Sequence, residues 1–353
     1  MGFVASVAYT KLVAETDFKN PDTARMLRLG IASGLVGLVV IVLVTLAVGR
    51  SAIDGAAIEK IIARTTLWPM LLSMAIMSTA FVFLGHRWRA LLISEPRPPG
   101  LGLAAILCAG LLLNSALPGP VGEFGAAWFA HRRYRVSLGL SLAAGMGARI
   151  IGMVVAASVA AVCFWLARPP VPETYRHAID LTAALVALLA IGLTAVVWRP
   201  EWMVAVSSKT IAKVRLTRRL DETVHEAAAG LISLRTQGPW AYIRCILWSI
   251  GAHGSVYLGI LIAAWSLGSE PSLSGLLFTY ATTTAAVVVM FALPGSQVGW
   301  DAIFLTLLTT TAGLALPDAL AVAVVVRVQQ LVIMAIGAGA LTWLARTAAE
   351  DGE

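Results

Sequence analysis

The chain has 353 residues, of which 59% are hydrophobic and 13% are charged, and its mean hydropathy is +0.84. This composition excludes a soluble globular protein and is typical of an integral membrane protein. A nucleic-acid partner is not expected, because a net charge of +7 in a membrane protein reflects Lys and Arg in cytoplasmic loops and against anionic lipids.

The first membrane half is expected at residues 29–198. Residues 1–28 precede it; they are too polar for a signal peptide and are interpreted as a cytoplasmic tail. A helix needs about 20 apolar residues to cross the hydrocarbon core. Spans are predicted at residues 29–49, 68–93, 138–167 and 177–198. At the inner end of the second span, His86, Arg87 and Arg89 are expected to make only ordinary head-group contacts.

An interrupted apolar region lies between the second and third of these spans, at residues 101–131. It is too long for one helix and contains ALPGPVGEFG, residues 116–125. Proline removes a backbone donor and clashes with the preceding turn, so a helix usually ends there. We therefore predict a re-entrant hairpin that enters and leaves the membrane on one side. Its turn is assigned to Pro118, Gly119 and Gly122.

A long polar stretch, residues 199–240, separates the two membrane halves. Its apolar residues recur three and four apart, beside Lys209, Lys213 and further basic residues up to Arg219. This spacing favours an interfacial amphipathic helix on the cytoplasmic leaflet. A plain connector between the halves fits the sequence equally well.

The second membrane half is expected at residues 241–346, followed by a short cytoplasmic tail, 347–353. It contains predicted spans at 241–267 and 319–345 and a second interrupted apolar region at 274–314. The turn of this second re-entrant hairpin is assigned to Pro294, Gly295 and Gly299. Residues typical of the membrane interface flank the spans of both halves; they include Trp68, Trp165, Trp198, Trp240 and Trp343.

The distribution of Lys and Arg indicates the orientation of the chain. With a cytoplasmic N-terminus and two hairpins, 18 of the 26 Lys and Arg residues lie in inside segments and five lie in outside segments. This asymmetry agrees with the positive-inside rule and places both termini in the cytoplasm, at the inner membrane. The remaining three, Arg149, Arg244 and Arg327, lie within membrane segments.

The two interrupted regions form an internal repeat. The tetrapeptide ALPG occurs in both, Glu123 corresponds to Asp301, and each acid is followed 26 residues later by an arginine, Arg149 or Arg327. The hairpins enter from opposite sides, so the halves are inverted. We therefore predict an all-α integral membrane protein with six full transmembrane helices and two re-entrant broken hairpins in an inverted repeat, an architecture typical of secondary transporters.

The paired Pro-Gly motif followed by Gly and an acid resembles the transmembrane region of lysylphosphatidylglycerol synthases, over roughly residues 25–345. That region defines a flippase-like family of bacterial and archaeal membrane proteins. The resemblance implies the flipping of aminoacylated phospholipids, polyprenyl-linked sugars or other polar lipids. The chain has no soluble aminoacyl-transferase domain, so only the lipid-moving part is implied. It also departs from the expected Gly-x-Glu pattern at Trp300 and Asp301.

The candidate transport residues are the two acids and the two arginines. An ionisable group at membrane depth is a functional hypothesis by default. Glu123 and Asp301 are expected to bind a cationic head group or exchange a proton, or else to cap a helix N-terminus. Arg149 and Arg327 are expected to hold a lipid phosphate, or to form a buried salt bridge with the acid of the same repeat.

Four further residues are secondary candidates. Asn114 and Gln297 are able to add hydrogen bonds inside a polar cavity, or to be satisfied core residues. His253 is interpreted first as a hydrogen-bonded core histidine, and Arg244 as a residue whose side chain snorkels to the membrane surface.

Three functions are compatible with these patterns. The first is a lipid translocase whose partners are membrane lipids with anionic or zwitterionic head groups. The second is a membrane lipid or sugar transferase, but DxD, HExxH and GxSxG motifs are absent, so neither catalytic residues nor a metal or other cofactor are expected. The third is a non-catalytic membrane partner of a cytoplasmic lipid-modifying enzyme.

Overall fold

The computed structural model describes residues 63, 65–92, 94, 96–116, 121–169, 173–199, 232, 238–290 and 296–350. The predicted tail and first span, most of the connector and both ALPG turns lie outside these residues. Within them the chain is helical and contains no strand. The predicted helical fold class is therefore confirmed for this part of the chain.

Four of the described helices are long and apolar enough to cross a membrane. These are α4 (Leu67–Leu91), α7 (Leu138–Val162) with its π-helical extension to Leu166, α11 (Pro239–Ser266), and α14 (Leu316–Glu350) as far as Trp343. They coincide with the predicted spans 68–93, 138–167, 241–267 and 319–345. The predicted span 177–198 forms α8 (Arg176–Trp198), whose apolar stretch Ala183–Gly192 is shorter than a full crossing. The count of six spans therefore stays a prediction.

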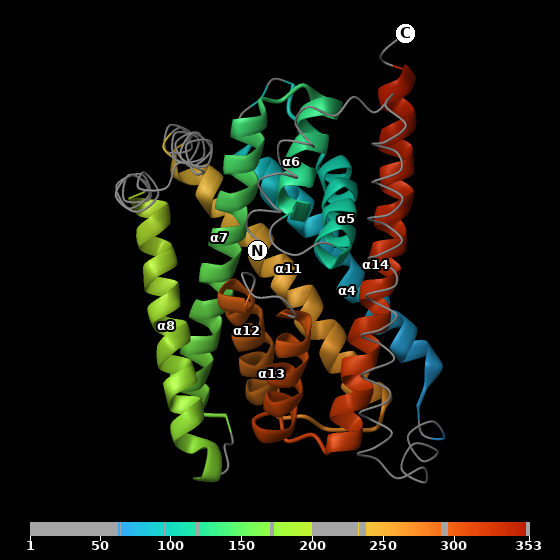
Figure 1. The fold of residues 1–353 in the computed structure, drawn as a ribbon. Helices are drawn as coiled ribbons and strands as arrows, with labels where there is room; N and C mark the ends of the chain where they lie inside the picture. Colours follow the sequence, from blue (N-terminus) through green and yellow to red (C-terminus); the bar gives the residue numbers. More distant parts are fainter. Residues whose placement is uncertain are drawn as a thin grey trace.

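Each of the two interrupted regions forms a pair of helices that are shorter than the four membrane-length helices. The first pair is α5 (Gly100–Ala116) with α6 (Val121–Tyr134), and the second is α12 (Leu273–Met290) with α13 (Ser296–Thr310). Both pairs are antiparallel hairpins: Gly110 faces Gly122 in the first, and Thr279 bonds Thr311 through their hydroxyls at 2.8 Å in the second. In Figure 1 the first pair occupies the upper half and the second the lower half, beside α7 and α14.

Close packing of α4 against α11 joins the two halves of the chain. Small residues allow membrane helices to approach closely. At Gly259 of α11 a Cβ would overlap Met77, and the Ser73 hydroxyl donates to the Gly259 carbonyl at 2.8 Å. The bond satisfies a hydroxyl that has no water available within a membrane.

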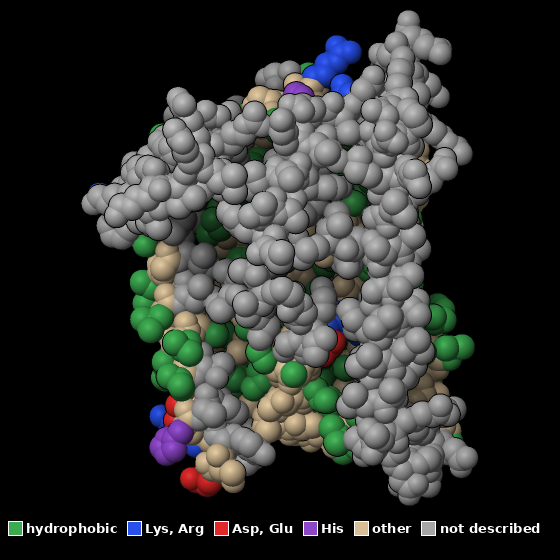
Figure 2. Space-filling view, viewed as in Figure 1, with side chains coloured by type: hydrophobic (Ala, Val, Ile, Leu, Met, Phe, Trp, Pro, Cys, Tyr) green, Lys and Arg blue, Asp and Glu red, His purple; other side chains and the backbone are tan. Residues whose placement is uncertain are grey.

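The outer flank of the bundle is apolar. Along α8, Leu181, Leu185, Leu188 and Ile191 are all exposed. Figure 2 shows hydrophobic side chains over this flank, with charged side chains at its lower end. Such a surface is favourable against lipid tails and unfavourable in water. The described residues therefore have the surface of a membrane protein.

The α12–α13 hairpin supplies a test of this packing. A Cβ at Gly275 would overlap the backbone of Thr311, which cannot move aside as a flexible side chain can. We predict that Gly275→Ala lowers the thermal midpoint in detergent, because overpacking costs about 1–3 kcal/mol. Gly339→Ala on α14 is the matched control, because nothing lies within 4 Å of its Cβ position. Equal midpoints for the two variants would contradict the hairpin packing.

Candidate functional site

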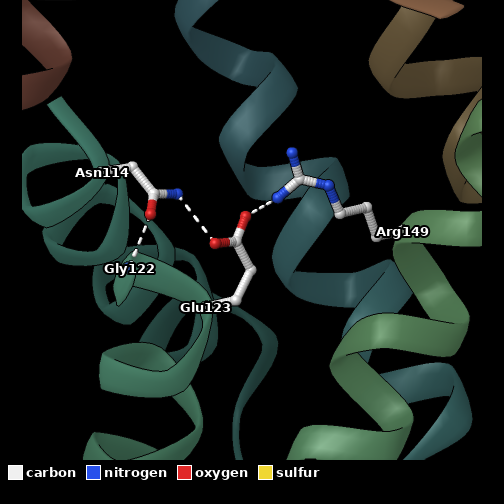
Figure 3. A network of polar contacts seen from close by, with 4 residues as sticks. All are labelled: Asn114, Gly122, Glu123 and Arg149. Atoms are coloured by element: carbon white, nitrogen blue, oxygen red, sulfur yellow. Dashed lines mark hydrogen bonds and ion pairs between the residues drawn. The ribbon is translucent and has the colours of Figure 1, made fainter. Parts of the chain in front are cut away.

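Glu123 lies in the first turn of α6, directly after the interruption of the first hairpin. Asn114, near the end of α5, holds it there. The Asn114 amide donates to one Glu123 carboxylate oxygen at 3.0 Å, and its carbonyl accepts from the backbone N–H of Gly122. Figure 3 shows the amide pointing towards both partners. The polar ends of Asn114 are thus satisfied, and the two helices are joined close to the interruption between them.

Arg149 forms an ion pair with the other carboxylate oxygen of Glu123. It extends from the middle of α7 across to α6, as Figure 3 shows. The Arg149 and Glu123 side chains remain 30% and 22% exposed. A buried charge needs a partner, and this pair provides one while leaving both groups within reach of a polar ligand.

Asp301 and Arg327 form the corresponding pair in the second half. Asp301 lies on α13 and Arg327 on α14, and one Asp301 oxygen accepts from Arg327 Nε at 2.9 Å and lies 2.7 Å from Nη2. Arg327 also donates to Gln330 at 2.5 Å, and its guanidinium lies 5.1 Å from the centre of the Trp300 ring. Only 4% of the Arg327 side chain is exposed.

The two pairs have the same connectivity but different environments. In each, the acid lies on the second helix of a hairpin and the arginine lies 26 residues later, on the next long helix. The first arginine is 30% exposed, whereas the second is 4% exposed and is enclosed by an amide and an indole. The first pair has the geometry of an accessible binding site, and the second has the geometry of a closed brace.

The residues assigned to the two turns, and Gln297 beside the second turn, differ in where the structure places them. Pro118, Gly119, Pro294 and Gly295 lie outside the described residues. Gly122 and Gly299, which were assigned to the turns, instead lie within α6 and α13. Gly122 is needed for close approach, because a Cβ there would overlap the Gly110 carbonyl and Asn114. Gln297 is in the first turn of α13, and its side chain is not described.

The other two candidates do not contact the acid–arginine pairs. Both ring nitrogens of His253 are hydrogen-bonded at 2.8 Å, one to the Gly152 carbonyl and one to the Tyr280 hydroxyl. Arg244 is exposed on α11 and donates to the Trp240 carbonyl at 3.3 Å. The geometry of both residues matches the structural interpretation made from the sequence.

Two polar residues at the sites were missed by the sequence analysis. Gln330 contacts Arg327, and its position one helical turn away in an apolar span was an available signal. Arg87 was assigned to head-group contacts at the end of its span. Its guanidinium instead lies against Gly152, near the middle of α7.

Membrane-length helices, two antiparallel hairpins and paired charges among apolar residues define an integral membrane protein with polar sites inside its helical bundle. The chain matches the family described as "Lysylphosphatidylglycerol synthase TM region" over residues 30–337. It belongs to this family of membrane proteins of lipid metabolism or transport. Comparison with curated proteins gave no match, and comparison with solved structures gave none either.

The different burial of the two pairs gives a prediction about stability. Asp301→Asn removes the carboxylate from an arginine that is 4% exposed, and breaking a buried pair costs about 3–5 kcal/mol. Glu123→Gln removes the carboxylate from an arginine that is 30% exposed, so the loss of stability is smaller. We expect thermal unfolding in detergent to show the larger decrease for Asp301→Asn.

The double variant Asp301→Asn/Arg327→Gln serves as the control for this comparison. It removes both charges, so it is expected to recover part of the lost stability. Equal destabilisation by Asp301→Asn and Glu123→Gln would show that the two pairs do not differ in the way their exposure indicates.

Proposed function

We propose that the protein is a lipid translocase that moves a polar-headed lipid across the cytoplasmic membrane. The observation that carries this proposal is the partly exposed Glu123–Arg149 pair, held inside the bundle between a hairpin and a long helix. Charged groups at membrane depth are expensive and mark substrate paths more often than simple structural contacts. Membership of a family linked to lipid metabolism or transport supports the same function.

The chemistry of the pair fits an amphipathic cargo. A carboxylate attracts a cationic head group, and a guanidinium donates two parallel hydrogen bonds to a phosphate. A zwitterionic or aminoacylated phospholipid carries both kinds of group. Such a head group exchanges one internal ion pair for two external ones, so it enters without leaving a charge uncompensated.

In the proposed architecture the two hairpins are re-entrant and the halves are inverted. The hairpin helices α5, α6 and α13 have 17, 14 and 15 residues, fewer than the roughly 20 needed to cross the hydrocarbon core. The charge distribution favours cytoplasmic termini and a first hairpin that opens to the cytoplasm. A lipid head group then reaches Glu123 and Arg149 from the inner leaflet.

The closed Asp301–Arg327 pair has a different role in this proposal. It fixes the second hairpin to α14 through two contacts to one carboxylate oxygen. The second half then acts as a stationary frame, and the first hairpin, joined to α7 by a more exposed pair, is the part that separates when cargo binds.

A reconstituted translocation assay tests the proposal. We predict that Glu123→Gln and Arg149→Ala each reduce the transfer of a fluorescent aminoacyl-phospholipid between leaflets of proteoliposomes to the protein-free rate, because each leaves one charge of the cargo unpaired. Transfer is followed by chemical quenching of the probe in the outer leaflet.

Asp180→Asn is the control for this assay, because Asp180 is an exposed carboxylate on α8 and belongs to neither acid–arginine pair. It is expected to keep the wild-type rate. Unchanged transfer by both Glu123→Gln and Arg149→Ala, in protein that elutes as a folded species, would refute the assignment of this pair to transport.

A further inference from the structure

A second cation lies beside the first acid–arginine pair. The guanidinium of Arg87, on α4, occupies the space that a Cβ on Gly152 would fill, one turn along α7 from Arg149. Arg87 lies within electrostatic reach of Arg149. Within the part of the chain that the structure describes, Arg87 has no ion-pair partner, and its buried Nε has no hydrogen bond.

The direction of the Arg87 side chain is the opposite of that expected for a surface contact. Arg87 lies four residues before the end of α4, so the nearer membrane surface is beyond Leu91. Long side chains on a helix point back towards its N-terminus. Arg87 accordingly extends towards the middle of α7 instead of snorkelling to the near end of its own helix.

The local charge count favours an anion. Arg87, Arg149 and Glu123 together carry one excess positive charge, and the neighbouring His253 ring is engaged at both nitrogens by Gly152 and Tyr280. Isolated buried cations are costly and are retained where something neutralises them. Arginine suits a phosphate because its planar fork donates parallel hydrogen bonds, and Gly152 has no side chain to keep the Arg87 guanidinium away from α7.

An apolar cleft lies along α7, α11 and α12, the helices that carry Gly152, His253 and Tyr280. It has a volume of about 450 Å³, within the range of ligand pockets. Its lining includes Val159 on α7, Tyr257 on α11 and Leu277 on α12. On α7, Val159 lies two turns beyond Gly152, and on α11, Tyr257 lies one turn beyond His253. On α12, Leu277 lies one turn before Tyr280. The cleft is therefore one to two turns along each helix from the residues that surround Arg87.

We propose that Arg87 and Gly152 form a phosphate subsite for a phospholipid whose acyl chain occupies the cleft lined by Val159, Tyr257 and Leu277. The excess cation selects the phosphate, and the neighbouring apolar cleft selects a lipid over a free anion. This inference rests on the proposed function for the identity of the ligand as a lipid. It adds Arg87 as a second cation for the phosphate, beside Arg149, and a cleft for the acyl chain.

A binding measurement with matched lipids tests the subsite. The purified full chain in mild detergent is titrated with dioctanoyl phosphatidylglycerol, with dioctanoylglycerol, which has the same chains and no phosphate, and with inorganic phosphate. Binding is read from ligand-induced thermal stabilisation. For the wild type we expect the phospholipid to bind about 10-fold or more tightly than dioctanoylglycerol, and inorganic phosphate to bind more weakly than either.

Three variants locate the interaction. Arg87→Gln is expected to abolish the preference for the phosphate. Gly152→Ala is expected to weaken it, because its Cβ displaces the flexible end of Arg87 without touching backbone atoms. Leu273→Trp, at an exposed residue that lines the cleft, is expected to weaken the binding of both lipids. Gly254→Ala is the control, because nothing lies within 4 Å of its Cβ position.

The outcomes separate this inference from the proposed function. Equal binding of the two lipids by the wild type, or an intact phosphate preference in both Arg87→Gln and Gly152→Ala, would overturn the subsite. Inorganic phosphate binding as tightly as the phospholipid would show a soluble-anion site and also overturn it. Binding is measured without leaflets, so a protein that shows the expected preference but transfers no lipid would refute translocation alone.

Discussion

The pairing of charges inside an apolar bundle is the constraint on which the rest of the structure depends. A charge at membrane depth is retained only where protein or ligand compensates it. Glu123 requires Arg149, and that requirement fixes the α5–α6 hairpin against α7. Asp301 and Arg327 impose the same relation on α13 and α14. The interrupted helices are therefore positioned by electrostatics as well as by apolar packing.

The two halves use this constraint differently. In the second half the arginine is enclosed by Asp301, Gln330 and Trp300, and the pair is a brace. In the first half the pair is more exposed, and a further cation, Arg87, lies beside it. The same sequence motif thus gives one enclosed contact and one more exposed contact. The sequence difference that accompanies this is the Trp300–Asp301 dipeptide in the second repeat.

Much of the described fold was predictable from hydropathy and helix breakers. Four membrane-length helices lie within a few residues of predicted spans, and each interrupted region forms a pair of helices, because apolar length and proline act locally. The acid–arginine pairs were predictable from the shared interval of 26 residues. Gly122 was misassigned because close approach and turn formation both favour glycine. Arg87 was missed because its contact with Gly152 joins helices 65 residues apart, and no local pattern specifies it.

The interval of 26 residues also bears on how the chain assembles. Each ion pair lies within one hairpin and the helix that follows it, so each acid has its partner within its own half of the chain. The bonds that join distant segments are of another kind: His253 to Gly152 spans 101 residues, and Ser73 to Gly259 spans 186. Chains fold from the N-terminal part first, and pre-formed membrane helices then associate. The pairing of Glu123 with Arg149 therefore needs only helices of the first half, whereas the His253–Gly152 and Ser73–Gly259 bonds need both halves.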